Sequence, residues 1–132
     1  MTRHATGTFQ VAVTPQGEAD AANGIGLSRL GIAKTFSGDL AGTGTATMLA
    51  GDVQPNGVGV YVALERVSGT LDGKTGAFLF AHQGVMSADG MSLSITIVPG
   101  SGVGDLEGID GELTLVIDAD GTHNYDLAYT LP

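Results

Sequence analysis

The sequence contains no cysteine, few basic residues and no long apolar run, and each of these absences excludes a class of protein. Without cysteine the chain has no disulfide bond, no thiolate zinc site and no thiol nucleophile, which fits a reducing compartment. Five Lys and Arg residues stand against 14 Asp and Glu residues, and the net charge of −9 disfavours nucleic acids and anionic membranes as partners. The N-terminal residues pass directly into an alternating pattern, without a stretch typical of a signal peptide or a membrane span. We therefore expect a cytoplasmic protein.

Glycine, in contrast, is abundant, with 22 residues, and it recurs next to Asp or Asn. This composition disfavours helices and favours tight hairpin turns, which need positive φ angles. The pairs that predict turns are Asn23-Gly24, Asn56-Gly57, Asp72-Gly73, Asp89-Gly90, Asp110-Gly111 and Asp120-Gly121. Between them lie strand-like segments at residues 5–14, 27–37, 41–50, 58–68, 76–87, 91–98, 111–118 and 122–131.

Eight strands joined by short connections predict antiparallel neighbours and a closed barrel. Closure also removes the exposed edges that an open sheet would leave. Hydrophobic residues make up 42% of the chain, enough to build a core in a domain of this size. We expect an all-β, closed antiparallel eight-stranded barrel, formed as one domain by residues 1–132.

The strongest predicted hairpin runs from Val58 to Met86. If Asp72 and Gly73 form a two-residue loop, Leu71 pairs with Lys74, and the same register places Glu65 opposite Phe80 and Ala63 opposite His82. One face then carries Tyr61, Ala63, Glu65, Val67, Phe78, Phe80, His82 and Met86. The other face carries Val60, Val62, Leu64, Arg66, Leu79, Ala81, Gln83 and Val85.

We assign the face with the aromatic rings, Glu65 and His82 to the barrel interior, because ligand pockets are mostly apolar with a few placed polar groups. The other face is also largely apolar, so we expect it to be covered, most simply by self-association into a homo-oligomer.

A glycine-rich segment, GSGVGDLEGIDG at residues 100–111, predicts a sharp crossing that Leu106 and Ile109 anchor in the core. It resembles the turn that precedes a late strand in allene oxide cyclase and dirigent barrels. With residues 61–73, 78–82 and 123–125 it resembles a bacterial domain family related to those barrels, over nearly the whole chain from Thr8 to Tyr129. The resemblance implies a small calycin-type barrel that assembles as an oligomer, but the catalytic positions of allene oxide cyclases do not match residue by residue.

Glu65 is the most informative single residue, because a buried, unpartnered carboxylate costs several kcal/mol. It must therefore be paired, neutral or solvated. We expect burial to raise the pKa of Glu65 toward the working pH, so that Glu65 and His82 form a catalytic acid–base pair. The alternatives are an ion pair of Glu65 with Arg29, Lys34 or another strand cation, and a structural hydrogen bond of His82.

The rings and polar groups on the predicted inner surface are candidates to bind a substrate. They are Tyr61, Phe78, Phe80, Met86, His123 and Tyr125. The alternative role for these side chains is packing in the barrel lining or at an interface. Arg66 points away from Glu65 by strand alternation, so only one of the two can line the pocket.

No cofactor is expected. The histidines at positions 4, 82 and 123 lack the paired spacing of a metal site, and no phosphate-binding loop is present. The sequence thus favours a cofactor-independent isomerase or cyclase that acts on a hydrophobic small molecule. The alternatives are a non-catalytic barrel that binds such a molecule, and a structural homo-oligomer with a filled core.

Overall fold

The computed structural model describes all 132 residues, and its regular elements are all β-strands. The strands are β1 (Arg3–Pro15), β2 (Asp20–Ala22), β3 (Ile25–Gly38), β4 (Leu40–Val53), β5 (Val58–Leu71), β6 (Lys74–Ser87), β7 (Gly90–Ile97), β8 (Val103–Gly104), β9 (Asp110–Ile117) and β10 (His123–Thr130). The structure contains no helix that would span a membrane.

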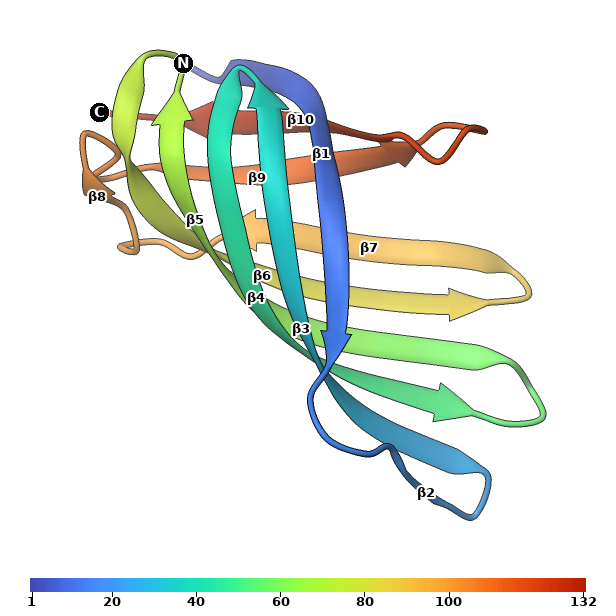
Figure 1. Cartoon of the computed structure of the whole chain (residues 1–132). Helices are drawn as coiled ribbons and strands as arrows, with labels where there is room; N and C mark the ends of the chain where they lie inside the picture. The colour runs from blue at the N-terminus through green and yellow to red at the C-terminus, as the bar shows by residue number, and fades with distance from the viewer.

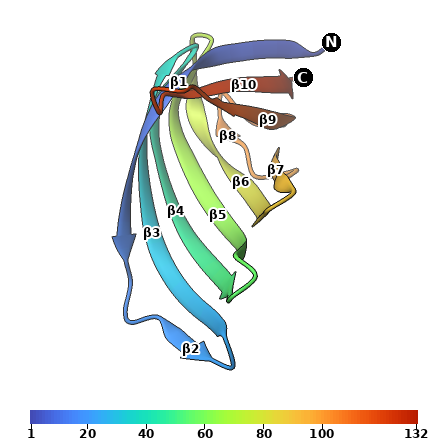
Figure 2. The ribbon, with the colours of Figure 1, turned by 90° about the vertical axis from the view of Figure 1, so that its right-hand side faces the viewer.

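Eight of these strands form a closed antiparallel barrel (Figure 1). The hydrogen-bonded order is β1-β10-β9-β7-β6-β5-β4-β3, and a further pairing of β1 with β3 closes the ring. Figure 2 shows β3, β4, β5 and β6 side by side as one broad curved wall. The two shortest strands lie outside the ring, β2 paired with β3 and β8 paired with β6. The predicted closed eight-stranded barrel is confirmed.

The number of hydrogen-bonded residue pairs between neighbouring strands varies around the barrel. Along β5 and β6 the pairing runs without interruption from Gly59↔Met86 to Leu71↔Lys74. Between β7 and β9, in contrast, the only bridge is Thr96↔Glu112. Figure 1 shows β7 diverging from β9 beyond this point. The β7–β9 seam is therefore the weakest link of the barrel wall.

Most of the Asp-Gly and Asn-Gly pairs that predict turns lie in turns of the structure. Asp72 and Gly73 have φ angles of 49° and 85°, and this loop sets the predicted register of β5 against β6. Asp110-Gly111 is an exception, because it lies within β9 and forms no turn. A Cβ at Gly111 would lie 2.3 Å from the carbonyl oxygen of Ala128 on β10. The glycine at this position is therefore required by close strand approach.

The hydrophobic core fills one end of the barrel, the end at which Figure 1 places both termini and β8. Leu106 and Ile109, from the glycine-rich crossing, are buried in it as predicted. The sixteen core residues are Ala5, Phe9, Phe36, Leu40, Val67, Leu71, Phe78, Phe80, Ile95, Ile97, Leu106, Ile109, Leu113, Tyr125, Leu127 and Tyr129. Towards the opposite end the inward positions become exposed, as at Val13 and Met86. The barrel is thus closed at one end and open at the other.

Tyr125 fastens β10 to the β3–β4 turn. Its hydroxyl accepts a hydrogen bond from the backbone N–H of Leu40 at 3.0 Å, and it lies 3.0 Å from the carbonyl oxygen of Ser37. The contact with Leu40 is buried, so the hydroxyl satisfies a main-chain group that water does not reach. Tyr125 is therefore part of the closed end.

We expect Tyr125→Phe to lower the free energy of unfolding by about 1–3 kcal/mol, because it leaves the buried N–H of Leu40 without an acceptor. Chemical denaturation measures this loss. The control is Tyr61→Phe, at a partly exposed ring near the open end, which should change stability by less than about 0.5 kcal/mol. Equal effects of the two substitutions would contradict this role of Tyr125.

Candidate active site

Apart from Tyr125 and Tyr129, Glu65 and His82 are the only residues with polar side chains among the 24 buried residues. Both point into the barrel, because β5 and β6 pair in the predicted register, with Glu65 opposite Phe80 and His82 opposite Ala63. Glu65 has no exposed surface, and His82 is 9% exposed. The predicted orientation of the hairpin is correct, and Arg66 lies on the outer face, as strand alternation requires.

One carboxylate oxygen of Glu65 holds two partners. His82 Nε2 lies 2.7 Å from Glu65 Oε1, and Lys34 Nζ lies 3.0 Å from the same oxygen. The second oxygen, Oε2, is buried and has no hydrogen-bond partner in the chain. The site is therefore a buried cluster of three ionisable groups with one unsatisfied acceptor.

Gly44 provides the space that the carboxylate of Glu65 occupies. A Cβ at this position would lie 2.1 Å from Glu65 Oε2 and 3.1 Å from the ring of Phe36. Gly44 lies on β4, between Lys34 of β3 and Val67 of β5. The missing side chain lets the ends of Lys34 and Glu65 meet across the intervening strand.

Lys34 is packed against aromatic rings as well as against Glu65. Its ammonium group lies 4.7 Å from the ring centre of Phe9 and 5.9 Å from that of Phe36. Its side chain is only 13% exposed. A cation over the face of an aromatic ring is attracted by the ring quadrupole, and the attraction is larger where water is excluded. The ion pair with Lys34, one of the alternatives for Glu65, is present.

The pKa of Glu65 is lower than that of an ordinary glutamate. Burial raises it, but the hydrogen bonds and positive charges that His82 and Lys34 contribute outweigh burial. The expectation that desolvation raises this pKa toward the working pH is therefore wrong. Glu65 remains ionised at neutral pH and acts as an acceptor for His82 and Lys34.

A pocket with a volume of about 180 Å³ lies beside this cluster, in the open half of the barrel. Most of its lining is apolar, and the polar lining groups are Lys34, Tyr61, Glu65, His82 and His123. The apolar lining residues are Phe9, Val11, Val13, Ile32, Ala46, Met48, Ala63 and Leu115. Burial raises the pKa of the Tyr61 hydroxyl, with a smaller contribution from the charge of Glu65, so the phenol stays protonated.

The structure brings together four of the eight predicted site residues around this pocket: Glu65, His82, Tyr61 and His123. The other four lie elsewhere. Phe78 and Phe80 belong to the filled core, although Phe80 still contacts the ring of His82 at a centroid distance of 5.9 Å. Tyr125 fastens the closed end.

Met86 has the parity of an inward position but is 51% exposed, because it lies past the end of the enclosed region. The sequence interpretation also missed Phe9, Met48 and Leu115, which come from strands distant in sequence. Alternation within β1, β4 and β9 would assign each an inward side, but it does not say which end of the barrel is open.

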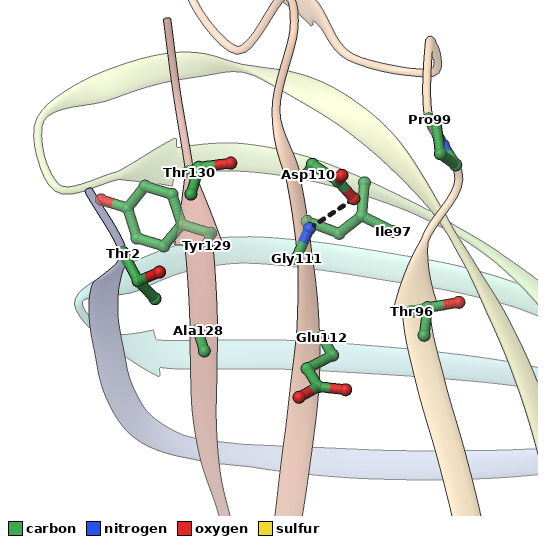
Figure 3. Close-up of a pocket in the computed structure, with 10 residues that line it drawn as sticks. All are labelled: Thr2, Thr96, Ile97, Pro99, Asp110, Gly111, Glu112, Ala128, Tyr129 and Thr130. Atoms are coloured by element: carbon green, nitrogen blue, oxygen red, sulfur yellow. Dashed lines mark hydrogen bonds between the residues drawn. The ribbon is translucent and has the colours of Figure 1, made fainter.

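A larger hollow, with a volume of about 480 Å³, lies elsewhere and has a different character. Figure 3 shows it on the wall formed by β7, β9 and β10, where the Asp110 carboxylate accepts a hydrogen bond from the backbone N–H of Gly111. Its carboxylates, Asp110 and Glu112, are both exposed on that wall. No lysine, arginine or histidine lines it. The smaller interior pocket is therefore the better candidate for chemistry.

The three histidines are placed apart, and their partners differ. His4 bonds Asp126 on the outer surface at 2.8 Å, and His82 bonds Glu65 inside the barrel. The ring of His123 packs against Phe9 at a centroid distance of 5.0 Å. Nowhere in the chain do three His, Cys, Asp or Glu side chains group so that they would hold a metal ion.

Comparison with known proteins finds similarity over almost the entire chain. Residues 5–129 match the family described as "Protein of unknown function (DUF3224)". A crystal structure of a protein of unknown function from that family, from Shewanella oneidensis MR-1, is 33% identical with a TM-score of 0.92, covering 100% of this chain and 99% of that chain. Among curated proteins none matches. The match supports the barrel and gives no support for a relationship to allene oxide cyclases.

We expect Gly44→Ala to disrupt the Glu65 cluster, because the new methyl group would overlap Glu65 Oε2. The His82 ring should lose its hydrogen bond, and stability should fall by about 1–3 kcal/mol. The imidazole resonances of His82 and the denaturation midpoint measure these effects. Gly59→Ala is the matched control, because the nearest atom to a Cβ there is 3.8 Å away. An unchanged His82 spectrum in Gly44→Ala would refute the overlap.

The lowered pKa of Glu65 predicts a pH-dependent contribution to stability. At pH 7 Glu65→Gln should cost about 3–5 kcal/mol, because it removes the counter-ion of the largely buried Lys34. The stability supplied by the carboxylate is complete above about pH 4.3, the ordinary pKa of glutamate, and is lost as the pH falls through the lower folded value. Unfolding free energies of the wild type and the variant should therefore converge in acid. A constant difference down to pH 2 would contradict the lowered pKa.

Proposed function

This chain belongs to the DUF3224 family of proteins of unknown function, and we propose from its pocket that it is a cofactor-independent isomerase. In this proposal a small hydrophobic molecule occupies the open half of the barrel, where the Glu65–His82 pair moves a proton on it. The observation that carries the proposal is an imidazole bonded to a buried carboxylate at the wall of an apolar pocket.

The pocket limits the size and polarity of the ligand. Its volume of about 180 Å³ is below the roughly 300–1,000 Å³ of pockets that hold drug-sized molecules. It therefore suits a small molecule, or one end of a longer apolar chain that extends through the open end. The exposed inward residues at that end, such as Val13, would contact the rest of such a chain.

The hydrogen bond to Glu65 fixes the orientation of His82. An ionised carboxylate only accepts hydrogen bonds, so His82 Nε2 carries the proton that it donates to Glu65 Oε1. The other ring nitrogen, Nδ1, is then the one left to act on a ligand. When Nδ1 takes up a proton, the charge of the imidazolium is compensated by the adjacent carboxylate, as in other carboxylate–histidine pairs.

The reaction that suits this arrangement is the transfer of a proton between two carbon atoms. His82 removes a proton from a carbon next to a carbonyl group, and the C–H electron pair moves into an enolate. His82 then returns the proton at a different carbon, so the product is an isomer and the balance requires no co-reactant. Tyr61, whose hydroxyl stays protonated, lines the same pocket and can donate a hydrogen bond to the developing oxyanion. Ring closure of a folded substrate would use the same proton transfers.

Binding without catalysis is the second candidate, and the apolar lining of the pocket favours it. In that case the Glu65 cluster would set the polarity of the pocket wall, and the ligand would be stored or carried unchanged. A barrel with a completely filled interior is less well supported, because the core occupies only the closed end.

The direct test is exchange of carbon-bound hydrogen in a small carbonyl compound, with 2-cyclohexen-1-one in D₂O as the probe. We expect the wild-type protein to accelerate deuterium incorporation next to the carbonyl group, as followed by NMR. His82→Gln should reduce the catalysed rate by about 10²–10⁴-fold, the usual contribution of a general base. His4→Gln, at an exposed histidine on the outer wall, is the matched control and should retain the full rate.

Titration of the protein with the same ketone, followed by NMR of the protein, separates catalysis from binding. Saturable shifts of the Tyr61 and His82 resonances without deuterium incorporation would support the binding role and refute the isomerase. Equal catalysed rates in His82→Gln and the wild type would also refute it.

A further inference from the structure

Exposed aliphatic side chains gather on the outer surface of the wall formed by β3, β4, β5 and β6, in the half nearer the open end of the barrel. Seven large aliphatic side chains on this surface are 37–59% exposed: Ile25, Leu27, Leu49, Val60, Val62, Leu64 and Val85. We call them the outer β3–β6 face. They point away from the pocket, because strand alternation places Glu65 and His82 on the inner side of the same strands.

The opposite wall, formed by β7, β9, β10 and β1, has a different composition. Its outward positions are mainly polar, with Ser and Thr the commonest residues. They are His4, Thr6, Thr8, Gln10, Ala12 and Thr14 on β1, Ser92, Ser94 and Thr96 on β7, Asp110, Glu112, Thr114 and Val116 on β9, and Asn124, Asp126, Ala128 and Thr130 on β10. The large exposed aliphatic side chains at outward positions are therefore concentrated on the β3–β6 side, and Val116 is the exception on the opposite wall.

The two walls also differ in the charged residues at their outward positions. The outward positions of β3, β4, β5 and β6 include no Asp or Glu, although the chain contains 14 of these residues. They include two exposed cations, Arg29 and Arg66. Two copies of a chain with a net charge of −9 repel each other at most orientations. Where the outer β3–β6 face of one copy meets that of the other, no carboxylate of these strands faces a carboxylate of the partner.

The shape of the face suits a symmetric contact. It has two shallow hollows, with volumes of about 290 and 440 Å³, and both are lined by Leu49 and Val62. These two residues are direct cross-strand partners, so they form a low ridge between the hollows. In a twofold arrangement the ridge of each copy is able to enter a hollow of the other.

The area of the wall is also adequate. Each of the four strands has 14 residues, which gives a wall roughly 45 Å long and 19 Å wide at standard strand spacings. A stable interface buries about 800 Å² of each partner. The whole wall is of this size, so the contact includes the aliphatic half and the outward Ser and Thr residues of the other half, such as Thr43 and Ser68.

We propose that the outer β3–β6 face binds a second copy of this chain, with a twofold axis close to Val62. The burial of the aliphatic side chains drives the association, and the absence of acidic residues directs it to this wall. The contact leaves the interior pocket free, because the pocket lies on the other side of the sheet. The proposal is thus independent of the function proposed for Glu65 and His82.

The first test compares the mass in solution of matched variants by light scattering after size exclusion, at micromolar concentrations. Wild-type protein should be a dimer, and Leu64→Glu should be a monomer. Val116→Glu is the control, because Val116 is 58% exposed on the opposite wall and Leu64 is 57% exposed on the outer β3–β6 face. Both residues are exposed, so unchanged circular dichroism is expected and confirms that each variant folds. A monomeric wild type, or equal loss of the dimer in both variants, would overturn the proposal.

The second test uses the absence of native cysteine. Oxidised Val62→Cys should form a disulfide-linked dimer, because the two copies of this position approach each other at the proposed axis. Val116→Cys should stay monomeric on a denaturing gel after the same oxidation. A dimer in solution with cross-linking of Val116→Cys and none of Val62→Cys would place the interface on the opposite wall and refute the assignment. Binding of the monomer to neutral phosphatidylcholine vesicles through this face would refute it in favour of a lipid surface.

Discussion

The interaction on which the rest of the site depends is the hydrogen bond between Glu65 and His82. Two buried polar side chains in an otherwise apolar interior would each be costly alone. Together with Lys34 they form a cluster in which one carboxylate oxygen compensates two positive or proton-donating groups. The inward-facing register of β5 and β6 makes this cluster possible, and a shift of one strand by one residue would place Glu65 and His82 on opposite sides of the sheet.

The closed end of the barrel supports this cluster by holding the strands in register. The aromatic core, the buried hydroxyl of Tyr125 and the anchoring side chains of Leu106 and Ile109 all lie at that end. The open end has few such contacts, so its inward positions are free to line a pocket. The residues that stabilise the fold therefore lie in the filled half of the barrel, and those of the proposed chemistry line the open half.

Much of the fold can be predicted from local sequence patterns, but only part of the site can. The Asp72-Gly73 turn fixes a hairpin register by itself, because both residues adopt the positive φ angles that a two-residue loop requires. Lys34 is 31 residues from Glu65, and its contact depends on the adjacency of three strands and on the missing side chain of Gly44. The direction of the Glu65 pKa shift depends on these contacts too, so burial alone predicted the wrong sign. The positions of Phe78, Tyr125 and Met86 depend on which end of the barrel is filled, and alternation carries no information about that.

The β7–β9 seam has a consequence for how the barrel accommodates a guest. Because a single bridge joins these strands, the main-chain groups on either side of it lack the partners that hold the rest of the cylinder at fixed circumference. Leu115 lines both the gap between these strands and the interior pocket. A small outward displacement of β7 from β9 would therefore break few hydrogen bonds. It would enlarge the cavity enough to admit a wider ligand.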